Sequence, residues 1–136
     1  MKIELLKVKE AHGESISNPE AVLALMHQEA AADRECIWIL HLNTANKIIE
    51  KELAGMGDIA SALVRPATVM RKAVINNTRA IIVIHNHPSG DPKASKDDQE
   101  VAARLKKAGG ILGIQLLDFV VIATGGYVSF NEERIL

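Results

Sequence analysis

The chain has 136 residues, of which 48% are hydrophobic and 24% are charged. This length suits one domain of ~100–200 residues, and this composition excludes a largely disordered or fibrous chain. With 16 Lys and Arg against 17 Asp and Glu, the formal net charge of −1 gives no global reason to bind nucleic acid. The single cysteine, Cys36, excludes an internal disulfide and a cysteine-rich zinc site, so any metal site needs histidine and carboxylate ligands.

The sequence shows no sign of export or of a membrane span. Charges interrupt the apolar residues at positions 1–7, which excludes the hydrophobic core of a signal peptide. The most apolar stretch, residues 111–123, contains Gln115 and Asp118 and falls short of the ~20 residues that a spanning helix needs. We therefore expect a soluble, cytoplasmic protein with no membrane partner.

The first elements are read from periodicity and from helix and turn signals. Residues 3–10 alternate apolar and polar side chains, which predicts an opening strand. Asn18 and Pro19 predict a helix start, and the apolar stripe that follows extends the helix to about Ala31. The runs 36–42 and 48–53 flank the turn residues 43–46 and predict an antiparallel hairpin.

The second half of the chain alternates helices and strands. Residues 66–75 have helical spacing, with Val69, Met70 and Val74 able to face a core. Residues 80–84 form a continuous apolar run, which predicts a central strand that is covered on both faces. The remaining predicted elements are a loop at 86–94, a helix from Ser95 to Gly109 and Gly110, a strand at 112–123 and a short strand at 127–130. This order predicts a single-domain α/β fold with helices flanking a mixed sheet.

Two histidines follow the predicted central strand, where α/β folds tend to bind ligands. His85 and His87 lie on one side if the strand continues through them, because side chains alternate along a strand. The loop can fold back and bring Asp98, in the first turn of the next helix, beside them. Two histidines and one carboxylate leave a tetrahedral zinc ion one open position for water, which is typical of a catalytic site.

The residues match a complete pattern rather than isolated ligands. His85, His87, Pro88, Ser95 and Asp98 fill every fixed position of H-x-H-P-x6-S-x2-D. Each residue alone has a simple structural explanation, such as a strand-end hydrogen bond or an acid at a helix N-terminus. The whole pattern is too much to expect by chance in a short chain.

This pattern resembles the zinc motif of the JAMM (MPN+) metalloproteases, and the match is closer to the RadC-like JAB branch. The resemblance extends from Pro19 over nearly the whole chain and is carried by the runs 81–83, 85–92, 109–114 and 129–130. It implies one JAB/MPN domain over residues 1–136, with a core at about 19–132 and a cytidine-deaminase-like architecture. The chain has no room for the helix-hairpin-helix segment of full-length RadC proteins, so we expect a stand-alone catalytic domain. Phe119 stands where the family often has histidine, which leaves no role for a histidine there.

The resemblance also implies a mechanism. His85, His87 and Asp98 would hold one Zn²⁺ per chain, which would activate a water molecule and polarise the scissile carbonyl. Ser95 would orient the developing oxyanion, cap the helix, or do both. A glutamate upstream of the motif would move the proton. Glu35, followed by the apolar run 36–40, is the preferred candidate for this catalytic residue, while Glu29, Glu50 and Glu52 are the competitors.

The remaining polar residues are expected to have supporting roles. Asn86 should face away from the metal and stabilise the loop, and Cys36 should be buried in packing. The other histidines, His12, His27 and His41, have no spacing that pairs them and default to surface or structural roles. Basic residues that include Arg104 and Lys107 form either a solvated helix face or a basic patch.

Several functions remain open at this point. The preferred one is a zinc-dependent hydrolase that cleaves a peptide or isopeptide bond in a peptide or protein substrate. The alternative is a DNA repair-associated accessory, suggested by the historical RadC label, although the charge does not support a nucleic-acid partner. A third is a non-catalytic JAB scaffold, against which the intact motif argues. A zinc deaminase is disfavoured because its H-x-E and P-C-x-x-C signature is absent. A homodimer is compatible with all of these.

Overall fold

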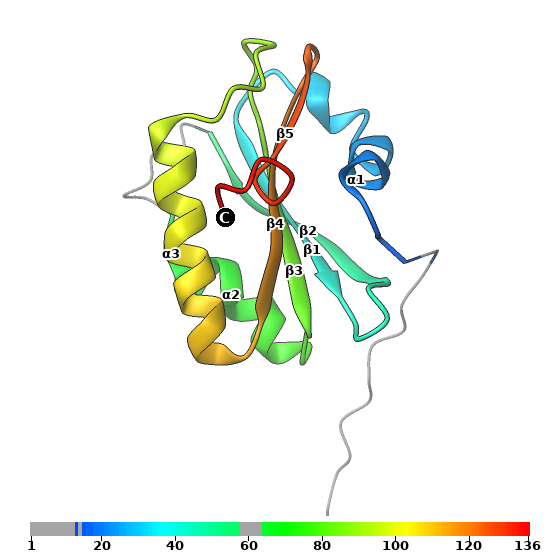
Figure 1. Cartoon of the computed structure of the whole chain (residues 1–136), viewed down its shortest axis with the longest axis vertical. Helices are drawn as coiled ribbons and strands as arrows, with labels where there is room; N and C mark the ends of the chain where they lie inside the picture. Colours follow the sequence, from blue (N-terminus) through cyan, green and yellow to red (C-terminus); the bar gives the residue numbers. More distant parts are fainter. Residues whose placement is uncertain (1–12, 14, 58–63) are drawn as a thin grey trace, which may run out of the picture.

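The apolar run after Arg79 forms β3 (Ala80–Asn86), the central strand of a five-stranded sheet (Figure 1). The computed structural model describes residues 13, 15–57 and 64–136. The strand order is β2-β1-β3-β4-β5, where the other strands are β1 (Cys36–Leu42), β2 (Ile48–Met56), β4 (Gln115–Ala123) and β5 (Gly126–Ser129). Among the strands of the described residues, only β3 and β4 pair in parallel, so the sheet is mixed and the predicted α/β class is confirmed.

The helices cover both faces of this sheet. Figure 1 shows α1 (Pro19–Leu25) on one face, and α2 (Pro66–Ile75) and α3 (Lys96–Leu112) on the other. Alternate residues of β3 enter two separate apolar clusters: Ile81 and Val83 pack with α2 and α3, and Ile82 and Ile84 pack with α1. All seven residues of β3 are buried, as the continuous apolar run predicts.

Strand β1 pairs with β2 on one side and with β3 on the other. The hairpin turn is held by the side chain of Asn43, whose Oδ1 accepts from the N–H groups of Ala45 and Lys47. Strand β2 continues past its predicted end at Leu53, so that Met56 pairs with Cys36 and the Gly57 N–H donates to the Glu35 carbonyl at 2.8 Å. This extension matters for the site, because it braces the backbone that enters β1.

The structure corrects two expectations about the first helices, and a third expectation concerns residues that the structure does not describe. The strand at residues 3–10 lies outside the described residues. The helix expected to reach about Ala31 ends at Leu25, and a short 3-10 helix, η1 (Glu29–Ala31), follows. Val22, Met26 and Ala30 are all buried and keep the i, i+4 spacing across the break, so periodicity could not reveal it. Val74 is 57% exposed rather than in the core, because Ala73 takes the inward position on α2.

Helix α3 is longer than the sequence predicts. Gly109 and Gly110 continue the helix to Leu112, and Gly113 ends it with a left-handed φ of 76°. The strand that follows therefore begins at Gln115 instead of residue 112. The reason is packing: a Cβ on Gly109 would overlap the carbonyl oxygen of Ile114, so this glycine permits the close approach of α3 to β4.

Within the described ranges, no helix combines the length and the apolar character that crossing a bilayer requires.

The paired glycines of α3 provide a test of this close approach. Gly109→Ala should lower the free energy of unfolding by roughly 1–3 kcal/mol, because the added methyl group forces α3 away from β4. Gly110→Ala meets nothing within 4 Å and should leave stability unchanged or raise it by ~0.5–1 kcal/mol. Urea unfolding of both variants measures the difference, and equal stabilities would contradict the packing at Gly109.

Candidate metal centre

The two motif histidines lie at the carboxyl end of β3. His85 is the penultimate residue of the strand, and His87 follows directly after it. The His87 N–H donates to the Ile122 carbonyl of β4 at 2.9 Å, which keeps the chain extended through the motif. Both side chains therefore lie on the face that carries α3, as the alternation of a strand predicts.

Asp98 comes from the first turn of α3 and is positioned by a capping box. Ser95 is the N-cap: its Oγ accepts from the Asp98 N–H at 3.0 Å, and its own N–H donates to Asp98 Oδ2 at 2.8 Å. The loop between β3 and α3 is braced on β4–β5, where the Gly125 N–H donates to the Gly90 carbonyl at 3.0 Å. The loop thereby brings the start of α3 beside the end of β3.

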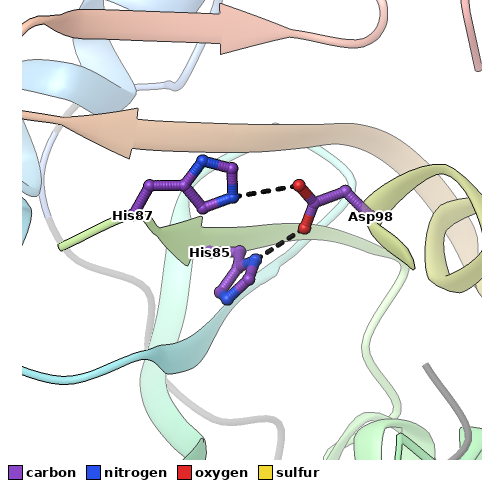
Figure 2. Close-up of side chains that lie close together, drawn as sticks. All are labelled: His85, His87 and Asp98. Carbon is purple, nitrogen blue, oxygen red and sulfur yellow. Dashed lines mark hydrogen bonds and ion pairs between the residues drawn. The ribbon is translucent and has the colours of Figure 1, made fainter. Parts of the chain in front are cut away.

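The side chains of His85, His87 and Asp98 point toward one another (Figure 2). His85 Nδ1 donates to Asp98 Oδ1 at 2.6 Å, and His87 Nε2 faces Asp98 Oδ2 at 3.0 Å. Asp98 is only 3% exposed, so its carboxylate is the buried centre of the cluster. The spacing predicted from the motif is thus realised in space.

Hydrogen bonds decide the charge of this cluster. Burial alone would raise the pKa of the Asp98 carboxyl, but the bonds from His85, His87 and the Ser95 N–H outweigh burial and hold its pKa well below the ordinary value. The hydrogen bond to Asp98 raises the pKa of His87, with smaller contributions from the Asp91 carbonyl and from the charge of Glu35. Asp98 is therefore an anion near neutral pH, as a metal ligand must be.

The donor set fits a metal ion. One ligand atom from each of the three residues lies within 4.8 Å of the others. Among the described residues, His85 Nε2 is a buried side-chain atom with no hydrogen-bond partner, and such an atom is costly unless a ligand satisfies it. His87 Nδ1 donates to the Asp91 carbonyl at 3.0 Å, so only a proton or a metal ion satisfies Nε2 opposite Asp98.

A cleft of about 680 Å³ opens beside these residues. His85, His87 and Ser95 line it, and so does Glu35, which directly precedes the neighbouring strand β1. In the register of β1 on β3, Ile37 pairs with His85. If this antiparallel register is continued by two residues, Glu35 lies across from His87. The structure therefore brings Glu35 to the cleft, and its catalytic role stays a prediction.

The competing glutamates lie elsewhere. Glu29 of η1 pairs with Lys51, and Glu50 of β2 pairs with Lys72. Glu52 is buried against His41, whose Nε2 lies 2.9 Å from its Oε1. None of the three lines the cleft, so among the candidates that spacing alone could not separate, geometry favours Glu35.

Ser95 has the geometry for both of its predicted roles. Its Oγ accepts from the Asp98 N–H, which makes it the helix cap. The hydroxyl hydrogen is not used in that bond, and Ser95 lines the cleft, so the hydroxyl has a hydrogen to donate to an oxyanion.

Two supporting contacts were not predicted from the sequence. The Asp91 carbonyl orients the His87 ring, and such a backbone acceptor leaves no signal in residue identity. Asn86, expected to stabilise the following loop, instead gives its side-chain amide to β1: its Oδ1 accepts from the Cys36 N–H at 2.7 Å, and its Nδ2 donates to the Arg34 carbonyl at 2.9 Å. The alternation of the strand correctly turned Asn86 away from the histidines but could not reveal its partners.

Three other polar residues, Cys36, His41 and Asp118, are buried and do not line the cleft. Cys36 is buried, and burial raises the pKa of its thiol, which does not favour a nucleophile. His41 is fully buried, and His12 lies outside the described residues. Asp118, beside the unusual Phe119, accepts from Ser129 Oγ and from the backbone N–H groups of Phe119 and Asn131, which fixes the end of β5.

Comparisons with known proteins agree with this geometry. Residues 16–135 match the family model described as RadC-like JAB domain. A UPF0758 protein of Clostridium perfringens is 40% identical over 131 residues, which cover 96% of this chain and 58% of that protein. A UPF0758 protein of Symbiobacterium thermophilum is 38% identical over 122 residues, which cover 89% of this chain and 52% of that protein.

The chain thus spans between about 52% and 58% of the length of these relatives. The family model, by contrast, covers the described core from β1 to β5 together with every residue of the metal cluster. On this evidence, the chain belongs to the RadC-like JAB domain family.

Proposed function

We propose that this protein is a zinc-dependent metallohydrolase that cleaves peptide or isopeptide bonds. The observation that carries the proposal is the cluster of His85, His87 and Asp98, whose two histidines line a cleft that Glu35 also lines. Two imidazoles and a carboxylate suit zinc and leave one coordination position open. The substrate would be a peptide or protein that reaches this cleft.

The residues divide the chemistry among them. A bound zinc ion would make a water molecule more acidic and polarise the scissile carbonyl. Glu35 would accept the proton of the attacking water and pass it to the leaving amine. Ser95 would donate its hydroxyl hydrogen to the carbonyl oxygen as negative charge develops there. Asp91 would hold His87 in the tautomer that presents Nε2 to the ion.

The DNA-associated alternative has less support. The net charge is −1, and two of the basic residues that a patch would use are engaged within the fold. Arg104 Nη1 donates to the Val64 carbonyl at 3.0 Å, and Lys72 pairs with Glu50 at 2.7 Å. A hydrolase therefore accounts for the buried polar cluster, whereas DNA binding leaves it without a role.

Metal content is the direct test. Protein prepared without chelator should contain one zinc ion per chain by elemental mass spectrometry, and His87→Ala should lose it because one of three ligands is removed. His27→Ala, at an exposed histidine outside the cluster, is the control and should retain zinc. Wild-type protein without stoichiometric zinc would refute the proposal.

The raised pKa of His87 predicts opposite effects of pH on stability and on zinc affinity. In the metal-free protein, the folded state binds the His87 proton more tightly than the unfolded state. The resulting stabilisation is complete below the ordinary histidine value of 6.5 and is lost as pH rises through the higher folded pKa. Zinc must displace that proton, so its affinity should fall by up to about tenfold per pH unit on acidification.

Both measurements would be made at about pH 6 and about pH 8. The midpoint of urea unfolding in the presence of a chelator gives the stability of the metal-free protein, and a competition titration gives the affinity for zinc. His87→Gln should remove this dependence of stability on pH, whereas His27→Gln, at an exposed position, should preserve it. The stability of the metal-free wild type over His87→Gln should be greater at the lower pH. If this difference is the same at both pH values, the interaction of His87 with Asp98 is contradicted.

Removal of the proposed general base should separate catalysis from metal binding. Glu35→Gln should keep stoichiometric zinc but lower peptide or isopeptide hydrolysis by ~10²–10⁴-fold, because a glutamine side chain cannot accept the proton. Glu29→Gln is a matched control, since Glu29 is also partly buried but does not line the cleft. Hydrolysis can be followed as new primary amino groups, which are amino termini from peptide bonds and lysine ε-amines from isopeptide bonds, in a peptide library that includes lysine-linked peptides. Equal rates in the two variants would exclude Glu35 as the base.

A further inference from the structure

We propose that Asn86 is a positioning residue for Glu35: its side-chain amide holds the two peptide groups that flank the glutamate and thereby sets the carboxylate opposite the metal cluster. This inference rests on the proposed function, in which Glu35 is the general base.

The contacts of Asn86 bracket Glu35 on both sides. The Arg34 carbonyl belongs to the peptide group that precedes Glu35, and it accepts from Asn86 Nδ2 at 2.9 Å. The Cys36 N–H belongs to the peptide group that follows Glu35, and it donates to Asn86 Oδ1 at 2.7 Å. One side chain thus fixes both peptide planes between which the glutamate is held.

These contacts act where the main-chain ladder stops. The pairing of β1 with β3 ends at Ile37 and His85, so the backbone of Glu35 lies beyond the last pair. The side chain of Asn86 replaces the ladder there, and on the other edge the Gly57 N–H donates to the Glu35 carbonyl at 2.8 Å. Glu35 is therefore held from both neighbouring strands, β2 and β3.

The chemistry of asparagine suits this task. Asn86 is 0% exposed, and its amide supplies an acceptor and a donor at the same distance from the backbone. Aspartate lacks the donor, and an apolar side chain lacks both groups. The side chain of Arg34 does not perform this role, because it is exposed and pairs with Asp33.

The position of Asn86 couples the proposed base to the ligands. It is the last residue of β3 and lies between His85 and His87 in the chain, while its side chain holds the start of β1. A shift of the start of β1 relative to the histidines would therefore break one of the two hydrogen bonds of the Asn86 side-chain amide. Asn86 in this way sets the position of Glu35 relative to the metal cluster through bonds to the backbone of Arg34 and Cys36.

A spectroscopic test avoids the need for a known substrate. We would load the full chain with Co²⁺ in place of zinc and follow its visible absorption as a function of pH. Glu35→Gln should displace the midpoint of this titration, because Glu35 lines the cleft beside the two histidines and the substitution removes its negative charge. Asn86→Ala and the milder Asn86→Ser should both bind stoichiometric Co²⁺ and move the midpoint most of the way toward the Glu35→Gln value.

The matched control is Ile82→Ala, at a buried residue of the same strand and the same face, which pairs with Leu40 of β1 instead of residues 34–36. It should lose stability but keep the wild-type midpoint. If Glu35→Gln shifts the midpoint and the Asn86 variants do not, the positioning role is wrong while the proposed function stands. If the wild type binds no metal, or Glu35→Gln has no effect, the proposed function and this inference fall together.

A measurement on the wild type covers variants that do not fold. The Cys36 amide proton should exchange slowly, and NMR should detect a scalar coupling across the hydrogen bond from the Cys36 nitrogen to the side-chain carbonyl carbon of Asn86. Rapid exchange without this coupling would overturn the inference.

Discussion

The architecture of the site depends on one buried carboxylate. Asp98 is 3% exposed, and an ionised carboxylate in that position is strongly unfavourable unless several donors face it. Three donors do so: His85, His87 and the Ser95 N–H. The first two come from the carboxyl end of β3 and the residue just after it, and the third comes from the N-cap of α3. The carboxylate can therefore stay charged only when the strand, the returning loop and the helix are all in their native places.

The two sides of the cleft are related through the strand pairs. His85 belongs to β3 and His87 follows it directly, whereas Glu35 directly precedes β1, so the register between these strands sets the distance between ligands and proposed base. Strand β3 is buried on both faces, so a shift of register would move polar and apolar side chains to the wrong sides. The position of Glu35 is thus determined by core packing as well as by hydrogen bonds. This explains how a residue fifty positions earlier than the histidines is brought to their cleft.

Much of this arrangement could be predicted from the sequence because it depends on local patterns. The continuous apolar run of β3, the capping residues of α3 and the spacing from His85 to Asp98 are all visible in the residues themselves. What could not be predicted depends on contacts between distant segments. Gly109 continues α3 because Ile114 approaches it, and spacing alone could not separate Glu35 from Glu29, Glu50 and Glu52. The contacts of Asn86 with β1 belong to the same class, since the sequence shows which way the side chain turns but not what it meets.

Asp98 has two tasks that one carboxylate can perform together. It closes the capping box of α3, where Oδ2 accepts from the Ser95 N–H, and it contributes to the cluster with both histidines. A carboxylate oxygen has two lone pairs, so the bond to the backbone leaves electron density for a metal ion. The cap therefore need not break when a metal binds, and the start of α3 is held in the same place before and after. Such a ligand is pre-organised by its own helix, which lowers the entropic cost of assembling the site.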